Sequence, residues 1–153
     1  MTTRHPILHV DDSDEDIFLF EYACKLAGID DPIQNVNDGQ QAIDYLNGSG
    51  KFKDRTQFPL PKALLLDLKL PYVMGLDVLK WIRQDSPMKS LIVIVLSSSF
   101  YEEDIERAYS LGANAFLIKP SDLNALADMC KALRHFWLTH NQPPLLFRAN
   151  VSL

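Results

Sequence analysis

The sequence has no long apolar segment. No stretch approaches the roughly 20 consecutive apolar residues that a helix needs to cross a bilayer. The chain begins Met-Thr-Thr-Arg-His-Pro, without the apolar core of a secretory signal. We therefore expect a cytoplasmic protein that has no membrane-spanning part and does not act on membranes.

Cysteine is scarce, and positive charge is not concentrated anywhere. Cys24 and Cys130 lie inside helical patterns, and their spacing fits neither a metal site nor a disulfide framework, so we expect two reduced thiols in the core. The 15 lysines and arginines are outnumbered by 20 aspartates and glutamates, which gives a formal net charge of −5. Because binding to nucleic-acid phosphates needs clustered positive charge, we expect no nucleic-acid partner.

The chain also lacks internal repeats and any linker-like stretch. Its 153 residues suit one ordinary domain, and a hydrophobic content of 47% is enough for one substantial core. We expect one domain over residues 1–140 and a C-terminal tail over residues 141–153. Such a short tail cannot fold as an independent output domain.

Short apolar runs alternate with helical patterns along the whole chain. Ser13 suits the N-cap of the first helix and Gly28 suits its end. The segment 47–61 is long for a connection inside a compact domain, so it either moves or makes contacts. The alternation predicts a parallel sheet with helices on both faces. The expected strands are 6–10, 33–36, 62–67, 91–96 and 115–118, and the expected helices are 14–27, 38 or 39 to 46, 76–82, 105–111 and one from 122.

Polar residues follow four of the apolar runs. Asp11 and Asp12 follow the first run, Asp67 the third, Ser97 the fourth and Lys119 the fifth. Ligands of open α/β sheets bind outside the carboxyl ends of the strands, so one fold would bring these side chains to one edge. Clustered carboxylates repel one another, and a hard divalent cation such as Mg²⁺ removes that cost. The set suits a metal and a phosphoryl group, and the alternative is a group of solvated loop acids.

The remaining residues at this edge also have structural interpretations. Lys119 is either an exposed lysine before a turn or an ammonium that neutralises the carboxylates and a phosphoryl oxygen. One serine of 97–99 is expected to cap the next helix or form a turn, while the Ser97 hydroxyl also suits a phosphoryl oxygen. A serine nucleophile is not expected, because no histidine base accompanies it. Phe116 is equally suited to core packing.

Four motifs together resemble the receiver domain of two-component response regulators over residues 5 to about 140. They are Val10-Asp11-Asp12, Leu66-Asp67-Leu68-Lys69-Leu70-Pro71 with Gly75, Leu96-Ser97-Ser98, and Phe116-Leu117-Ile118-Lys119-Pro120. The resemblance implies an α/β, flavodoxin-like fold, a doubly wound five-stranded parallel sheet (βα)5 with strand order 2-1-3-4-5. The loop 47–61 and the ending Phe136-Trp137…Asn141-Gln-Pro-Pro look like stand-alone regulators paired with phytochrome-like sensor histidine kinases.

The resemblance also implies how a phosphoryl group and a metal would be held. Asp67 would accept the phosphoryl group from a sensor histidine kinase. Asp12 and Asp67 would ligate Mg²⁺, with Asp11 nearby or acting through water. The Lys69 carbonyl would complete the metal site.

Three further roles follow from the same resemblance. Lys119 would grip the phosphoryl group and Ser97 would bond to it, while Phe116 would turn inward as a switch when Ser97 moves. The chain departs from the commonest pattern at Ser97, where threonine is frequent, at Ser98, where alanine is frequent, and at Ser90, where proline often precedes the strand. A regulator of this kind catalyses only its own phosphorylation and dephosphorylation, so we expect no enzyme activity on a separate substrate.

Three other classes share part of the pattern. A haloacid-dehalogenase-like phosphatase needs a second acid two residues after its nucleophile, where this chain has Lys69, and no cap domain is evident. A flavodoxin-type flavin carrier needs a phosphate loop after the first strand, where the run from Asp11 to Asp16 would repel phosphate. A degenerate receiver normally loses an acid or the lysine, and this chain keeps them.

The C-terminal region carries more apolar residues than one core face needs. These are Phe136, Trp137, Leu138 and the run Leu145-Leu146-Phe147. Because exposed apolar groups of this density mark an interface, we expect a homodimer through the fourth helix, fifth strand and fifth helix, with the tail packed on or across the partner. The alternative is that Phe136 and Trp137 cover the monomer's own sheet and that the tail is disordered.

Overall fold

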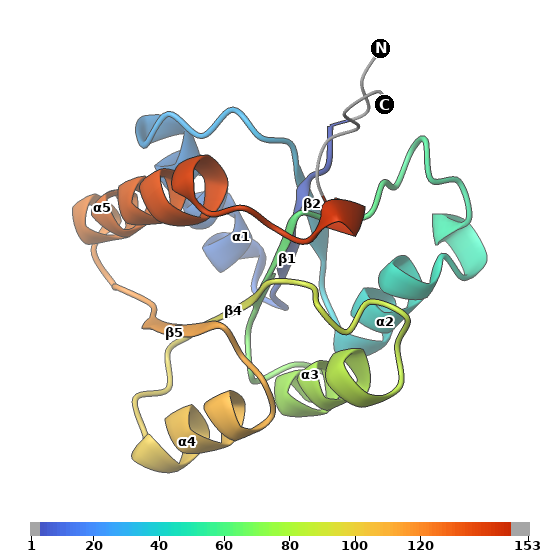
Figure 1. Cartoon of the computed structure of the whole chain (residues 1–153). Helices are drawn as coiled ribbons and strands as arrows, with labels where there is room; N and C mark the ends of the chain where they lie inside the picture. The colour runs from blue at the N-terminus through green and yellow to red at the C-terminus, as the bar shows by residue number, and fades with distance from the viewer. Residues whose placement is uncertain (1–3, 148–153) are drawn as a thin grey trace.

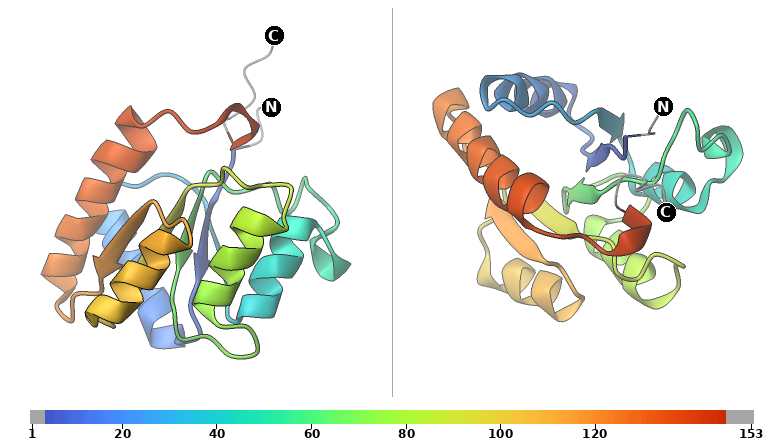
Figure 2. Two further views of the ribbon diagram at one scale, coloured as in Figure 1. Left: turned by 60° about the horizontal axis from the view of Figure 1, so that its bottom comes forward. Right: turned by 45° about the horizontal axis from the view of Figure 1, so that its top comes forward.

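The computed structural model describes residues 4–147 and has the predicted architecture, a five-stranded parallel sheet in the order β2-β1-β3-β4-β5. Helices α1 and α5 cover one face of the sheet, and α2, α3 and α4 cover the other (Figures 1 and 2). The strands are β1 (Ile7–Val10), β2 (Ile33–Val36), β3 (Ala63–Leu66), β4 (Val93–Ser97) and β5 (Ala115–Ile118). The helices are α1 (Asp14–Leu26), α2 (Gly39–Asn47), α3 (Gly75–Gln84), α4 (Glu102–Ser110) and α5 (Leu123–Leu133), which continues as a π-helical segment, Arg134–His140.

Strand residues alternate between two cores because successive side chains point to opposite faces of a sheet. Leu64 and Leu66 of β3 belong to the core beneath α2, α3 and α4. Ala63 and Leu65 belong to the core beneath α1 and α5. The sheet is therefore buried on both faces. None of the helices among residues 4–147 is long and apolar enough to cross a membrane.

The predicted element ends are correct to within a few residues, and the first helix shows why. The Ser13 hydroxyl accepts a hydrogen bond from the backbone N–H of Asp16 at 3.2 Å, so Ser13 is the N-cap of α1 as predicted. Gly28, just beyond the helix, has a φ of +77°, a conformation that glycine adopts without the steric cost of a Cβ. Local signals of this kind therefore fix where α1 begins and ends.

The loop 47–61 makes contacts, which was one of its two predicted alternatives. It contains a short 3-10 turn, Gly50–Phe52, and the rings of Phe52 and Phe58 lie against each other and against Tyr45 of α2. The Arg55 guanidinium donates to the carbonyl oxygens of Tyr45 at 2.7 Å and Leu46 at 2.8 Å, which completes the end of α2. The loop is thus part of the packed domain.

The segment after the last helix crosses the end of the sheet at which the strands begin (Figure 2). It ends in a 3-10 turn, Leu145–Phe147, and the Phe147 ring is fully buried in the core beneath α2, α3 and α4. Trp137 packs on the opposite core, as the monomer alternative anticipated, whereas Phe136 is 56% exposed. The described part of the tail is therefore packed on its own chain. Residues 148–153 lie outside the described part. The predicted boundary between domain and tail at residue 140 stays a prediction.

Candidate functional site

The predicted site residues gather at the carboxyl edge of the sheet because parallel pairing sets neighbouring strand ends side by side. The pairing of Val10 with Leu66 brings Asp11 and Asp67 to adjacent positions. The backbone N–H of Asp67 donates to the Val10 carbonyl at 3.0 Å, and that of Lys119 donates to the Ser97 carbonyl at 2.8 Å. The ladder thus extends one step beyond the strands and fixes the backbones of Asp67 and Lys119.

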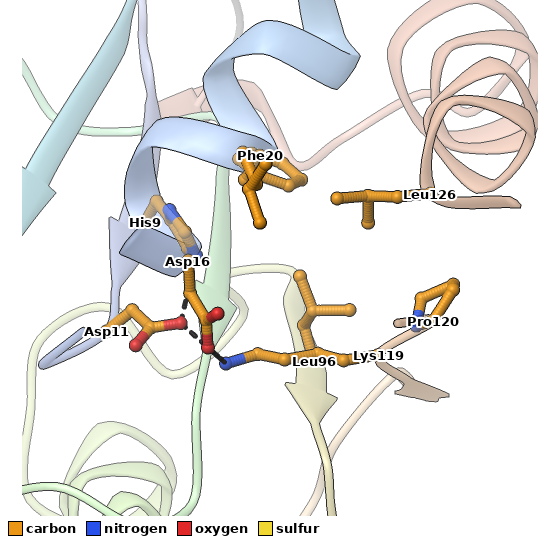
Figure 3. A pocket seen from close by; sticks show the side chains of 9 residues that line it. His9, Asp11, Asp16, Phe20, Leu96, Lys119, Pro120 and Leu126 are labelled. Atoms are coloured by element: carbon orange, nitrogen blue, oxygen red, sulfur yellow. Dashed lines mark hydrogen bonds and ion pairs between the residues drawn. The ribbon is translucent and has the colours of Figure 1, made fainter. Parts of the chain in front are cut away.

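The Lys119 ammonium is the centre of the site. Its Nζ donates to Asp11 Oδ2 at 2.6 Å, to Asp16 Oδ2 at 3.1 Å and to Asp67 Oδ2 at 3.2 Å (Figure 3 shows the first two). Burial disfavours the charged form, but the hydrogen bond to Asp11 and the charges of Asp67 and Asp11 outweigh it, so the pKa of Lys119 lies above its ordinary value. The predicted neutralising role of Lys119 fits this geometry.

The Asp67 carboxylate lies in a partly dehydrated position. Burial raises the pKa of Asp67, the charge of Lys119 opposes this, and the nearby charge of Asp11 adds to it, with a net upward shift. The backbone N–H of Leu68 donates to Asp67 Oδ1 at 2.7 Å and orients the group. A Cβ built on Gly75 would lie 2.1 Å from the Asp67 carbonyl oxygen, so only glycine lets α3 begin this close to the acid. A buried, oriented carboxylate beside an ammonium has the environment of a nucleophile.

Asp11, Asp12 and Asp67 form an acidic set suited to a metal ion. One carboxylate oxygen from each lies within 4.8 Å of the others, with Asp11 and Asp67 buried and Asp12 exposed. Three anionic oxygens at this spacing are the hard ligands that Mg²⁺ and Mn²⁺ take in proteins, so the donor set fits such a cation. Lys69 follows two residues after Asp67 and is exposed, and its carbonyl stays a predicted ligand.

Ser97, at the end of β4, and Ser99, in the loop before α4, form a chain of hydrogen bonds rather than a helix cap. The buried Ser97 hydroxyl accepts from the Ser99 N–H at 3.1 Å, which is the predicted turn, and Ser99 Oγ donates to Asp104 Oδ2 at 2.5 Å. The predicted serine cap of α4 is wrong, because its N-cap is Tyr101, without a side-chain cap bond. The Ser99 hydroxyl is instead used by Asp104 in the first turn of the helix.

Phe116 lies in the middle of β5 and is partly buried against the core beneath α2, α3 and α4. It is paired in register with Val95 of β4, two residues before Ser97. Its position agrees with both interpretations, core packing and a switch that responds to Ser97, so the switch stays a prediction.

Two residues of this edge were not predicted as members of the site. Asp16 was assigned only to the helix dipole, yet it contacts Lys119 from the first turn of α1. His9 is buried with Nε2 3.8 Å from Asp11 Oδ2, and burial lowers its pKa to about 4, so it is neutral at pH 7. Both line a cavity of about 40 Å³ beside Lys119 (Figure 3). The sequence signal for Asp16 was weak, because an acid in the first turn of a helix is common.

Comparison with known proteins places this site in a family. The model of the response regulator receiver domain matches residues 7–131. Response regulator Rcp1 of Synechocystis sp. is 35% identical over 132 residues, which cover 86% of this chain and 88% of Rcp1. The chain therefore belongs to the response regulator receiver domain family.

Solved structures agree with the sequence match. The response regulator RPA3017, in red light signaling of R. palustris, superposes with a TM-score of 0.85 and 36% identity, covering 91% of this chain and 98% of that one. The phosphorylated cyanobacterial phytochrome response regulator RcpA gives 0.82 and 32%, covering 92% and 99%. The Mn²⁺-bound form of Rcp1 gives 0.81 and 34%, also covering 92% and 99%. The expected receiver family and fold are confirmed, and nothing in these matches supports the haloacid-dehalogenase alternative.

Proposed function

We propose that this chain is a stand-alone response regulator that accepts a phosphoryl group on Asp67 from a sensor histidine kinase. The observation that carries the proposal is the position of the Asp67 carboxylate, 3.2 Å from the Lys119 ammonium and within 4.8 Å of the Asp11 and Asp12 carboxylates. A nucleophilic oxygen, a fixed cation and metal-ligating oxygens are the parts that phosphoryl transfer to an acid requires. On this proposal the chain acts on no separate substrate.

The residues divide the chemistry among them. An oxygen of Asp67 forms a bond to phosphorus while the phosphorus–nitrogen bond of the donor phosphohistidine breaks, and the imidazole nitrogen keeps the electron pair. Lys119 spreads the charge of the transferred phosphoryl oxygens, and the Ser97 hydroxyl donates to one of them. Asp11, Asp12, Asp67 and the Lys69 carbonyl would hold Mg²⁺. When bound, that ion neutralises carboxylate and phosphoryl charge.

We also propose the input and the output of this module. Two of the relatives act in red-light or phytochrome systems by name, which favours a phytochrome-like sensor histidine kinase as partner. Because a histidine kinase draws its phosphoryl group from ATP, we propose the cytoplasm as the place of transfer. The output would be a homodimer through α4, β5 and α5. Tyr109 of α4, Ile118 of β5 and Phe136, in the π-helical segment that continues α5, are 50%, 45% and 56% exposed.

Intact-mass measurement after incubation with acetyl phosphate tests the function. With Mg²⁺ present, the chain should gain one phosphoryl group, and the gain should vanish in Asp67→Asn or with excess chelator. The matched control is Asp85→Asn, which removes an exposed carboxylate after α3 and should be phosphorylated like the parent. An autophosphorylated kinase of the proposed class should give the same result. If Asp67→Asn gained as many phosphoryl groups as the parent, Asp67 would not be the acceptor.

A further inference from the structure

The Asp16 carboxylate holds Lys119 from outside the metal-ligating set. Asp16 Oδ2 lies 3.1 Å from Lys119 Nζ, although the two residues are 103 positions apart. Its side chain is 44% exposed, whereas that of Asp11 is fully buried, and it is not a member of the acidic set. Its backbone N–H is bound by the Ser13 cap, so the contact is built into the start of α1. Metal binding therefore does not explain the contact between Asp16 and Lys119.

We propose that Asp16 is a positioning residue that restrains the Lys119 ammonium on the α1 side of the pocket and so limits the rate at which Asp67 takes up a phosphoryl group. The inference rests on the proposed function of Asp67 and names a control on that same site. It assigns to Asp16 neither metal binding nor contact with the transferred group.

Counting donors gives the reason for the restraint. A lysine ammonium has three N–H donors, and here each faces one carboxylate, of Asp11, Asp16 and Asp67. Lys119 is thus fully engaged before any phosphoryl oxygen arrives. To meet that oxygen it must leave its present position, and the bond to Asp16 draws it back toward α1.

Charge acts in the same direction. Lys119 is one cation among the four carboxylates of Asp11, Asp12, Asp16 and Asp67. The phosphoryl donor is an anion, so the excess of negative charge over this one cation opposes its approach, and the same excess attracts Mg²⁺. Removing Asp16 should therefore have two opposite effects: faster uptake of the phosphoryl group and weaker binding of the metal.

The test compares three variants that separate contact from charge. Asp16→Asn keeps the size of the side chain and removes its charge, and Asp16→Glu keeps the charge and is the conservative rescue. Asp14→Asn is the matched control, since it removes an exposed acid from the same first turn of α1 and Asp14 has no ion pair among the described residues. Asp16→Ser serves as a second neutral variant if Asp16→Asn folds poorly.

Two measurements are made on each variant. At saturating Mg²⁺, phosphorylation of Asp16→Asn by acetyl phosphate should be about threefold faster than in the parent, and the Kd for Mg²⁺ from an NMR titration should rise about fivefold. Asp16→Glu should return both values toward the parent, and Asp14→Asn should leave both close to it. A loss of structure alone would slow phosphorylation and weaken binding together, so opposite signs exclude it. The smaller effect of Asp14→Asn then separates the contact with Lys119 from the general charge of α1.

Three results would overturn the inference. Equal changes in Asp14→Asn and Asp16→Asn would mean that the general charge of α1 acts rather than the contact with Lys119. An unchanged or slower rate in Asp16→Asn would mean that Asp16 does not restrain the lysine. An unchanged Kd for Mg²⁺ would mean that the Asp16 charge does not act on the site, and this too would overturn the inference. Failure of the parent chain to be phosphorylated would instead refute the proposed function, and the Mg²⁺ titration would still report on Asp16 separately.

Discussion

At the scale of single residues, the site balances buried charges that would be costly alone. Asp11 is fully buried, and its two oxygens accept from the Ser13 N–H at 3.0 Å and from Lys119. Asp12, beside it in the sequence, is exposed and keeps its carboxylate free of such bonds among the described residues. The predicted division of roles, with Asp12 as a direct ligand and Asp11 nearby, agrees with these partners and stays a prediction.

His9 adds a pH dependence at this scale. Burial lowers the pKa of its imidazole to about 4, below the value of 6.5 that the unfolded chain has. Between these values the unfolded chain binds a proton that the folded chain does not, so the free energy of unfolding should fall as the pH decreases from 6.5 to 4. The His9 contribution to this loss should approach about 3 kcal/mol.

Urea unfolding with chelator, at pH 7 and pH 4.5, measures this effect in the parent chain and in His9→Gln. Asp67 acts in the opposite direction, because its raised pKa lets the folded chain bind a proton first. Asp67 is present in both chains. The change in the free energy of unfolding between pH 7 and pH 4.5 therefore differs between the two chains only by the contribution of His9. Parallel pH profiles for the parent and His9→Gln would show that His9 does not have the lowered pKa.

At the scale of elements, the C-terminal 3-10 turn closes a core that strands and helices leave open. The Phe147 ring is fully buried, while the neighbouring Leu146 is 54% exposed. Truncating a buried phenylalanine removes apolar contacts and leaves a cavity, at a typical cost of about 3–5 kcal/mol. We expect Phe147→Ala to lower the free energy of unfolding by about 3 kcal/mol, because a terminal segment relaxes more easily than a central one.

Chemical denaturation at pH 7 checks this expectation, with Leu146→Ala as the matched control in the same turn. The control should change stability by less than about 0.5 kcal/mol, as surface substitutions usually do. If the two variants lost the same small amount, the turn would not be a part of the core in solution.

The loop between β4 and α4 is the element that joins the site to a surface. Ser97, which is predicted to bond the phosphoryl group, accepts from the Ser99 N–H, and Ser99 Oγ donates to Asp104 in α4. A shift of Ser97 would therefore act on the start of that helix through two hydrogen bonds. The partly exposed Tyr109 lies on the same helix, so the element provides a physical path from site to surface.

At the scale of the whole molecule, we predict that phosphorylation drives dimer formation. Sedimentation at tens of micromolar, as a rough working range for a weak complex, should show more dimer with beryllofluoride and Mg²⁺, which mimic the phosphorylated acid, than without them. Tyr109→Ser, on the proposed interface, should weaken the dimer, whereas Tyr72→Ser, on an exposed loop residue beside α3, should not. A monomer under both conditions would refute the dimer.

The two cysteines are another feature of the whole molecule. Cys24 of α1 and Cys130 of α5 are buried and free, as expected, and their sulfur atoms lie 4.0 Å apart. The sequence indicated their burial, because both fall on apolar helical faces. Their proximity follows only from the packing of α1 against α5 on one face of the sheet.

The sequence by itself determined the elements and most of the site. Periodicity, the Ser13 cap and the Gly28 stop are local signals, and they gave the five strands and five helices. The residues that follow the strands, Asp11, Asp67 and Lys119, could be assigned to one edge because a parallel sheet aligns its strand ends.

Only the tertiary structure decided the contacts between residues far apart in the chain. Asp16 and Lys119 meet across 103 positions, and Phe147 enters a core built from much earlier segments. Neither residue has a local pattern that distinguishes it from an ordinary first-turn acid or a tail aromatic. Such contacts depend on how α1, β5 and the C-terminal turn pack together, which is set by burial of both faces of the sheet rather than by any one segment.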